Sequence, residues 1–353
     1  MTDYRAYQGT KVLITGHTGF KGSWLRLWLT LLGAEVYGYS LSPETTPAHH
    51  TLLYPDEPVK ALDIRDRKRL EDAVRTIRPD IVFHLAAQPL VRRSYHAPVE
   101  TFDTNIMGTV HLLEACRQVN SVRAIIAVTS DKCYENREWV WGYRENDPMG
   151  GHDPYSASKG AAELIVASYR RSFFPVEHYG KSHGTLLASC RAGNVIGGGD
   201  WSEDRLIPDI VRATTRDEAV TIRAPHSIRP WQHVLDALGA YLLLGNRLLD
   251  GESAYAGAWN FGPNDETMTV REICESVHRL WPKTRFLFAE ESNGRHEANT
   301  LRLDCSKARS LLGWRNRWNT PESLERTVMW YRTFLEHKHL LSQIQIEEWM
   351  NHE

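Results

Sequence analysis

Residues 11–22 have the sequence Lys11-Val-Leu-Ile-Thr-Gly-His-Thr-Gly-Phe-Lys-Gly22. The apolar run predicts a buried strand over Lys11–Thr15, and the pattern that follows predicts a helix over Lys21–Leu32. The glycines between them allow a tight turn and a close approach of the backbone to a pyrophosphate at the helix N-terminus. A plain tight turn is the alternative, but the strand–turn–helix context favours a dinucleotide site.

The same alternation of apolar runs and helical patterns continues through the first half of the chain. Further strands are expected at 35–39, 81–85, 124–129 and 186–191, and further helices at 66–77, 105–119 and 154–173. Strands that alternate with helices predict a parallel sheet covered on both faces, a Rossmann-type doubly wound α/β fold. Beyond Arg191, glycines and prolines interrupt the pattern, and one more helix is expected over 321–335.

These patterns predict two domains. We expect a dinucleotide-binding domain over 1–190, to which 228–252 returns. A smaller mixed α/β domain over 191–227 and 253–353 is expected to bind substrate, with the substrate in the cleft between them.

Composition narrows the class of partner. The 353 residues carry a formal net charge of −2, so neither nucleic acid nor an anionic membrane is expected as a partner. No apolar run approaches the roughly 20 residues that cross a membrane, and the N-terminus does not resemble a signal peptide. The five cysteines are scattered without metal-type spacing, which favours free thiols and a cytoplasmic location.

The second predicted strand lacks a feature that usually accompanies this turn. An acidic residue normally ends it and holds the ribose of NAD, but here the strand runs into Ser40. No arginine stands there to hold the extra phosphate of NADP, so the sequence favours NAD and leaves NADP open. Ser40 could bind a ribose hydroxyl, and Asp63 could meet the adenine or, alternatively, cap a helix. His84 is expected to be a buried, hydrogen-bonded imidazole.

The predicted cofactor contacts follow the expected strand ends or open the expected helices. They are Gly16, Thr18, Gly19, Phe20, Lys21, Gly22, Ser40, Asp63, Ile64, Ala86, Ala87, Gln88, Thr104, Tyr155 and Lys159.

Tyr155 and Lys159 stand four residues apart, on one face of the expected helix. With the glycine pattern, Ala86-Ala87 and Thr104-Asn105, this pair resembles the short-chain dehydrogenase/reductase superfamily across the first half of the chain. The resemblance implies that Lys159 binds the nicotinamide ribose and lowers the pKa of Tyr155, which then acts as a base. It implies that Ser130 binds the same substrate oxygen. An incidental pair on a surface helix is the alternative.

Asp131 and Lys132 follow Ser130, and the length resembles the extended branch of the superfamily, which acts on nucleotide sugars. In that branch, 4,6-dehydratases carry two extra catalytic residues at this place. The resemblance implies that Asp131 protonates the departing C6 hydroxyl. It implies that Lys132 removes the C5 proton or stabilises the enolate. An exposed Asp–Lys ion pair is the simplest alternative.

Lysine in the second place resembles the CDP-glucose 4,6-dehydratase family. Four further segments carry that resemblance: 131–145, 191–201, 204–209 and 229–233. It implies a product for deoxysugar and surface-polysaccharide synthesis. It also implies a homodimer formed through helices 105–119 and 154–173, with a tetramer as the alternative. An epimerase or reductase of the same fold is the second hypothesis, and a non-catalytic dinucleotide-binding regulator is the third.

A nucleotide diphosphate requires cations and polar donors. For Arg229, Arg205 and Arg295 an ordinary surface arginine is the alternative. The predicted substrate contacts are Gln88, Asn194, Arg205, Arg229, Asn260 and Arg295. No metal ligands are expected.

Overall fold

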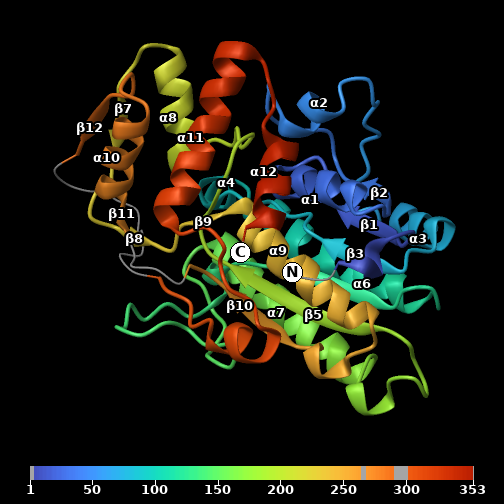
Figure 1. Cartoon of the computed structure of the whole chain (residues 1–353). Helices are drawn as coiled ribbons and strands as arrows, with labels where there is room; N and C mark the ends of the chain where they lie inside the picture. Colours follow the sequence, from blue (N-terminus) through green and yellow to red (C-terminus); the bar gives the residue numbers. More distant parts are fainter. Residues whose placement is uncertain (1–3, 264–267, 290–300, 353) are drawn as a thin grey trace.

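The structure is a computed structural model that describes residues 4–263, 268–289 and 301–352 (Figure 1). Its centre is a six-stranded parallel sheet in the order β10-β5-β4-β3-β1-β2. The strands are β1 (Lys11–Thr15), β2 (Glu35–Tyr39), β3 (Ile81–His84), β4 (Ala124–Val128), β5 (Leu186–Ala192) and β10 (Ala258–Phe261). Because the chain moves outward from β1 to β2 and then returns to the other side of β1 at β3, a crevice opens there at the carboxyl ends of the strands.

Successive side chains of each strand point to opposite faces of the sheet, and both faces are covered. Val12 and Ile14 join a core with α1 (Phe20–Leu31) and α9 (Val234–Leu249). Leu13 faces the other way, into a core that α3 (Arg67–Ile77), α6 (Gly108–Arg117) and α7 (Pro154–Ser172) complete. The predicted doubly wound fold is therefore confirmed.

Most of the remaining elements belong to the second half of the chain. The small strand pairs β7–β12 and β8–β11 gather with α8 and α10 at the left of Figure 1, away from the β2 edge. These elements are α8 (Leu206–Thr215), β7 (Val220–Ile222), β8 (Ile228–Arg229), β11 (Met268–Thr269), α10 (Val270–Leu280) and β12 (Phe286–Phe288). The others are η1 (Arg5–Tyr7), α2 (His49–Leu53), α4 (Val91–His96), α5 (Pro98–Phe102), η2 (Asp103–Met107), η3 (Asp131–Cys133), η4 (Val176–His178), β6 (Val195–Ile196), β9 (Gln232–His233), η5 (Ser253–Tyr255), η6 (Ala308–Leu312), α11 (Thr320–His337) and α12 (Ser342–Asn351).

The second half of the chain contributes elements to the main sheet and its covering layer. Within residues 228–252, α9 packs on β4 and β5. Residues after 253 were assigned to the substrate domain, but β10 pairs with β5 as the edge strand of the main sheet, and α12 packs on α1. Sequence pattern missed this because β10 is short and separated from β5 by the whole loop-rich segment. The two-domain division otherwise stays a prediction.

Two findings bear on the compartment and partners. All five cysteines are free and buried. Among the helices that the structure describes, none is long and apolar enough to span a membrane.

Candidate active site

A cavity of about 1300 Å³ opens at the carboxyl ends of the central strands. The cavity is lined by the residue that directly follows each of β1, β2, β3 and β4, namely Gly16, Ser40, Leu85 and Thr129. All fifteen predicted cofactor contacts line this one cavity. The fold therefore brings these residues together, while their contacts with a cofactor stay predictions.

The glycine-rich turn can have only glycine at two of its positions. Gly16 has φ +77°, and a Cβ there would lie 2.7 Å from the backbone nitrogen of Ala86. A Cβ on Gly22 would lie 2.1 Å from the carbonyl oxygen of Gly16. Gly19 is the N-cap residue of α1 and lines the cavity without a side chain. The turn thus brings bare backbone and a helix N-terminus to the cavity wall, which fits the pyrophosphate of a dinucleotide.

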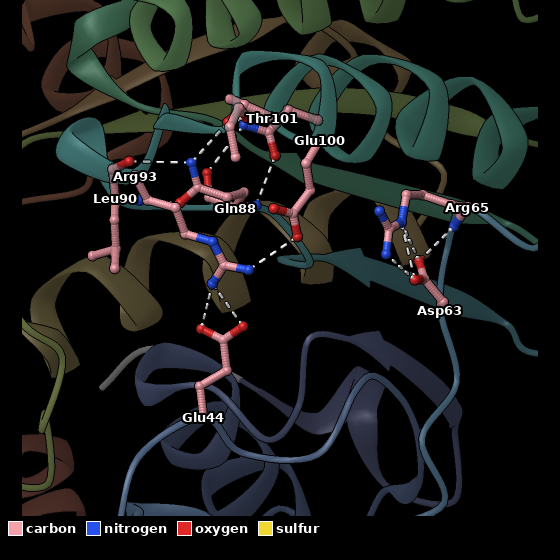
Figure 2. A network of polar contacts seen from close by, with 10 residues as sticks. Glu44, Asp63, Arg65, Gln88, Leu90, Arg93, Glu100 and Thr101 are labelled. Atoms are coloured by element: carbon pink, nitrogen blue, oxygen red, sulfur yellow. Dashed lines mark hydrogen bonds and ion pairs between the residues drawn. The ribbon is translucent and has the colours of Figure 1, made fainter. Parts of the chain in front are cut away.

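The adenosine side of the cavity has no acidic side chain directly after β2. Ser40 is buried, and its Oγ lies 2.8 Å from Thr18 Oγ1 and 3.1 Å from His17 Nδ1. Asp63 lies at the next strand connection, where Arg65 binds its carboxylate at 2.6 Å (Figure 2). That hydrogen-bonded ion pair lowers the pKa of Asp63. The neighbouring Asp66, and not Asp63, caps α3.

Tyr155 and Lys159 lie one turn apart on α7, and both are buried in the cavity wall. Burial raises the pKa of Tyr155 to about 12, although Ser130 and Arg205 act in the opposite direction. Burial lowers the pKa of Lys159 to about 8, against the influence of Glu163. In this structure burial thus outweighs the expected lowering of the Tyr155 pKa, because the phenol is enclosed more tightly than sequence indicates.

Ser130 and Asp131 are both buried and lie just beyond the carboxyl end of β4. Ser130 Oγ donates to Asp131 Oδ1 at 2.9 Å and accepts from the backbone nitrogen of Lys132 at 3.3 Å. Burial raises the pKa of Asp131, and Lys132 and Arg229 reduce that effect without reversing it. This raised pKa is the direction that a general acid requires. The alternative of an exposed Asp131–Lys132 ion pair is wrong, because the exposed fraction of Asp131 is only 3%.

A buried ion pair supports α7 beneath these residues. Glu163, one turn beyond Lys159, accepts from Arg191 of β5 at 2.7 Å. Its carboxylate also accepts from Thr129 and Ser189 at 2.5 and 2.8 Å. This network joins the residue before Ser130 to the helix that carries Tyr155, so it fixes their relative positions.

Several arginines that were not predicted from the sequence also line the cavity. Arg92, Arg93 and Arg223 line it together with the predicted Arg205. Arg205 is held by Asp200 at 2.9 Å. Arg93 bridges Glu44 and Glu100 across the cavity wall, as Figure 2 shows. The adjacent Arg92-Arg93 pair, shortly after Gln88, was the signal that could have revealed them.

Gln88 and Arg205 line the cavity, whereas Asn194 and Arg229 do not. The prediction for Asn260 is corrected, because its side chain is fully buried and used elsewhere. Its Oδ1 accepts from Tyr134, and its Nδ2 donates to the carbonyl oxygens of Tyr143 and Asp304. Asn260 lies on β10, and the amino-acid sequence did not reveal that β10 belongs to the main sheet.

The predictions for His84 and Arg295 remain to be compared with the structure. His84 is buried between Thr15 and Thr109 at 2.7 and 3.0 Å, so the structural interpretation is confirmed. The prediction for Arg295 lies outside the described residues.

The parallel sheet, the glycine-rich turn and the Tyr155–Lys159 pair define an extended short-chain dehydrogenase/reductase. Residues 13–327 match the model of the GDP-mannose 4,6 dehydratase family. The chain belongs to this family of nucleotide-sugar 4,6-dehydratases.

Named relatives agree with this assignment. The chain is 50% identical to the Salmonella typhimurium CDP-glucose 4,6-dehydratase, over 99% of both chains. It is similar to the Thermus thermophilus UDP-glucose 4-epimerase solved with NAD (27% identity, TM-score 0.74, covering 91% of this chain and 99% of that one). It shares the fold of the Streptomyces venezuelae dTDP-glucose 4,6-dehydratase solved with NAD (24% identity, TM-score 0.74, 91% and 97% covered).

Proposed function

We propose that this protein is an NAD-dependent CDP-glucose 4,6-dehydratase, a carbon–oxygen lyase that makes CDP-4-keto-6-deoxyglucose. The observation that carries the proposal is the buried Ser130–Asp131 pair beside Tyr155, in a chain half identical to a relative of that name. An epimerase or reductase of this fold has no use for an acid group at that place. The substrate base rests on the relative alone.

The chain's own groups divide the proton transfers. Tyr155 takes the proton of the C4 hydroxyl in its phenolate form, which the Ser130 hydrogen bond and Arg205 favour against burial, while Ser130 and Lys159 orient the sugar and ribose. The glycine-rich turn and Lys159 would hold NAD, which would supply the hydride chemistry between C4 and C6. Lys132 removes the C5 proton or holds the enolate, and Asp131 donates a proton to the C6 hydroxyl, which leaves as water. The unsaturated 4-ketosugar would then gain hydride at C6 and a proton at C5, which gives the product.

Substrate binding is proposed to use the cavity arginines. Arg205, with Arg92 and Arg223 close to the shared carboxylate of Asp204, provides cations for a diphosphate. Gln88, Asn194 and Arg229 stay candidates for contacts with the sugar or phosphate. We further propose a role in deoxysugar synthesis for surface polysaccharide such as O-antigen. We place the enzyme in the cytoplasm, since five unpaired cysteines suit a reducing compartment.

The deciding experiment is incubation of the purified chain and NAD with CDP-, dTDP- and UDP-glucose and GDP-mannose. Mass spectrometry should show loss of one water from CDP-glucose and little reaction of the others. Tyr155→Phe is the inactive control. An isomer of unchanged mass would instead establish an epimerase, and preferred dehydration of another nucleotide sugar would refute the choice of CDP-glucose.

A homodimer is proposed through the helices predicted for it. Val99 on α5, Met107 on η2 and Leu164 on α7 are 79, 42 and 62% exposed, and their elements pack together. Light scattering should give a dimer, and Val99→Glu with Leu164→Glu should give monomers. Leu287→Glu, at a 60% exposed position on β12, is the matched control. A monomeric parent protein would contradict the proposal, and a tetramer would extend it.

A further inference from the structure

Two histidines and a glutamate meet beside the glycine-rich turn, away from the catalytic pair. His17 lies in the turn between β1 and α1, His50 lies in α2, and Glu57 follows that helix. One potential ligand atom from each side chain lies within 4.8 Å of those of the other two. The rings of His17 and His50 meet edge to face, with centroids 5.2 Å apart.

His50 lacks the partners that a buried imidazole normally has. Its exposed fraction is 0%, and neither ring nitrogen has a hydrogen-bond partner within the described chain. The adjacent His49 is equally enclosed, but its two nitrogens meet Ser23 and Ser342, each at 2.8 Å. Because buried polar groups are nearly always partnered, the nitrogens of His50 point to a ligand.

The other two side chains are held as metal ligands usually are. Ser40 Oγ lies 3.1 Å from His17 Nδ1, which leaves Nε2 as the ligand nitrogen. Arg26 donates to both carboxylate oxygens of Glu57 at 2.9 and 2.6 Å. A carboxylate has about four acceptor positions, so Glu57 retains capacity for a cation while Arg26 orients it. The positive charge of Arg26 limits the affinity.

We propose that His17, His50 and Glu57 bind a divalent transition-metal ion. Two imidazoles and one carboxylate form a ligand set that Zn²⁺ accepts, with a fourth position for water. Bound there, the ion ties the glycine-rich turn to α2 and so fixes one wall of the cavity.

The test uses the complete chain, stripped of metal with a chelator and titrated with ZnCl₂ by calorimetry. We expect one tight site in the parent protein, and at least tenfold weaker binding in His50→Phe and in Glu57→Gln. His337→Gln, at a histidine side chain that is 71% exposed, should bind like the parent and controls for adventitious histidines. Zn²⁺ should raise the melting temperature of the parent and of His337→Gln, but not of His50→Phe.

Equal Zn²⁺ binding by the parent and by both ligand variants would overturn the proposal, as would no binding by the parent. Glu57 is exposed at the surface, so Glu57→Gln keeps the test valid if His50→Phe does not fold. None of these readouts depends on turnover or on the proposed substrate.

Discussion

Because Glu163 and Arg191 form a buried ion pair, we expect the replacement of Glu163 by glutamine to cause a large loss of stability. Glu163→Gln keeps the shape of the side chain but removes its charge. The two side chains are 3 and 5% exposed and their charged atoms lie 2.7 Å apart, so the variant leaves the Arg191 charge buried without its counter-ion. Removing one partner of a buried ion pair costs roughly 3–5 kcal/mol.

The amide introduced by Glu163→Gln fixes where in that range the loss falls. Its oxygen can still accept from Arg191 and Ser189, and its nitrogen can donate to Thr129, so the three polar partners remain paired. The loss should therefore lie at the lower end, about 3 kcal/mol of unfolding free energy. With roughly 2 °C per kcal/mol for a chain of this size, the melting temperature should fall by about 6 °C.

Chemical and thermal denaturation measure this loss, and the chain offers a matched control. Arg67 and Glu71 are also 2.7 Å apart, but their side chains are 58 and 13% exposed, so water reaches the charge of Arg67. Glu71→Gln should change the free energy of unfolding by less than about 1 kcal/mol, because water screens a pair with an exposed arginine and solvates that arginine once its partner is lost. If both Glu→Gln changes have the same effect, burial is not what gives the Glu163 pair its importance.

The pH dependence gives a second check on the same pair. Burial alone would raise the pKa of Glu163, but Arg191 and the hydroxyl donors outweigh it and hold that pKa below the ordinary value. The stabilisation is therefore fully present above the unfolded pKa of about 4.5, and it is lost as the pH falls through the folded pKa. The difference between parent and Glu163→Gln should shrink in acid. A constant difference would refute the electrostatic origin.

Four further predictions concern activity and pH. Tyr155→Phe should keep cofactor binding, measured by fluorescence titration, and lose about 10²–10⁴-fold in turnover; near-parental turnover would exclude it as the base. Lys132→Ala should keep cofactor binding but lose dehydration, so parental water loss in mass spectra would remove Lys132 from the mechanism. Turnover should fall above about pH 8 as Lys159, whose pKa burial lowers to about 8, loses its charge, and a flat profile to pH 10 would contradict this. Burial raises the pKa of Asp236 to about 7, so the free energy of unfolding should fall as the pH rises from the unfolded pKa of 3.8 to about 7 and should level off above that pH. Asp236→Asn should therefore gain up to about 4 kcal/mol at pH 8 but little at pH 4, and an equal gain at both pH values would refute the linkage.

The first half of the fold could be predicted because its signals are local. Strands β1 and β2 have the predicted bounds, since each apolar run is framed by a turn or helix pattern. The edge strand β10 could not be predicted, because four residues carry little periodicity and their partner β5 lies far away in sequence.

The same contrast between local signals and contacts from distant segments applies to the candidate active site. The cofactor residues sit at strand ends, and topology alone brings them to one cavity. Asn260 and the Tyr155 pKa depended on burial and on long-range partners, which sequence does not contain. Arg93 was missed for a related reason, because its partners come from separate segments.

The late position of β10 and α12 has a consequence for synthesis on the ribosome. The first five sheet strands emerge early, but β5 has no outer neighbour until β10 emerges, and Trp28 of α1 meets Trp349 of α12 only at the end. The nascent chain therefore exposes the outer edge of β5 until β10 emerges, and the aromatic face of α1 for most of translation, and both surfaces favour aggregation. Chaperone dependence during expression, and insolubility of a chain cut before Ser342, should follow from this order of emergence.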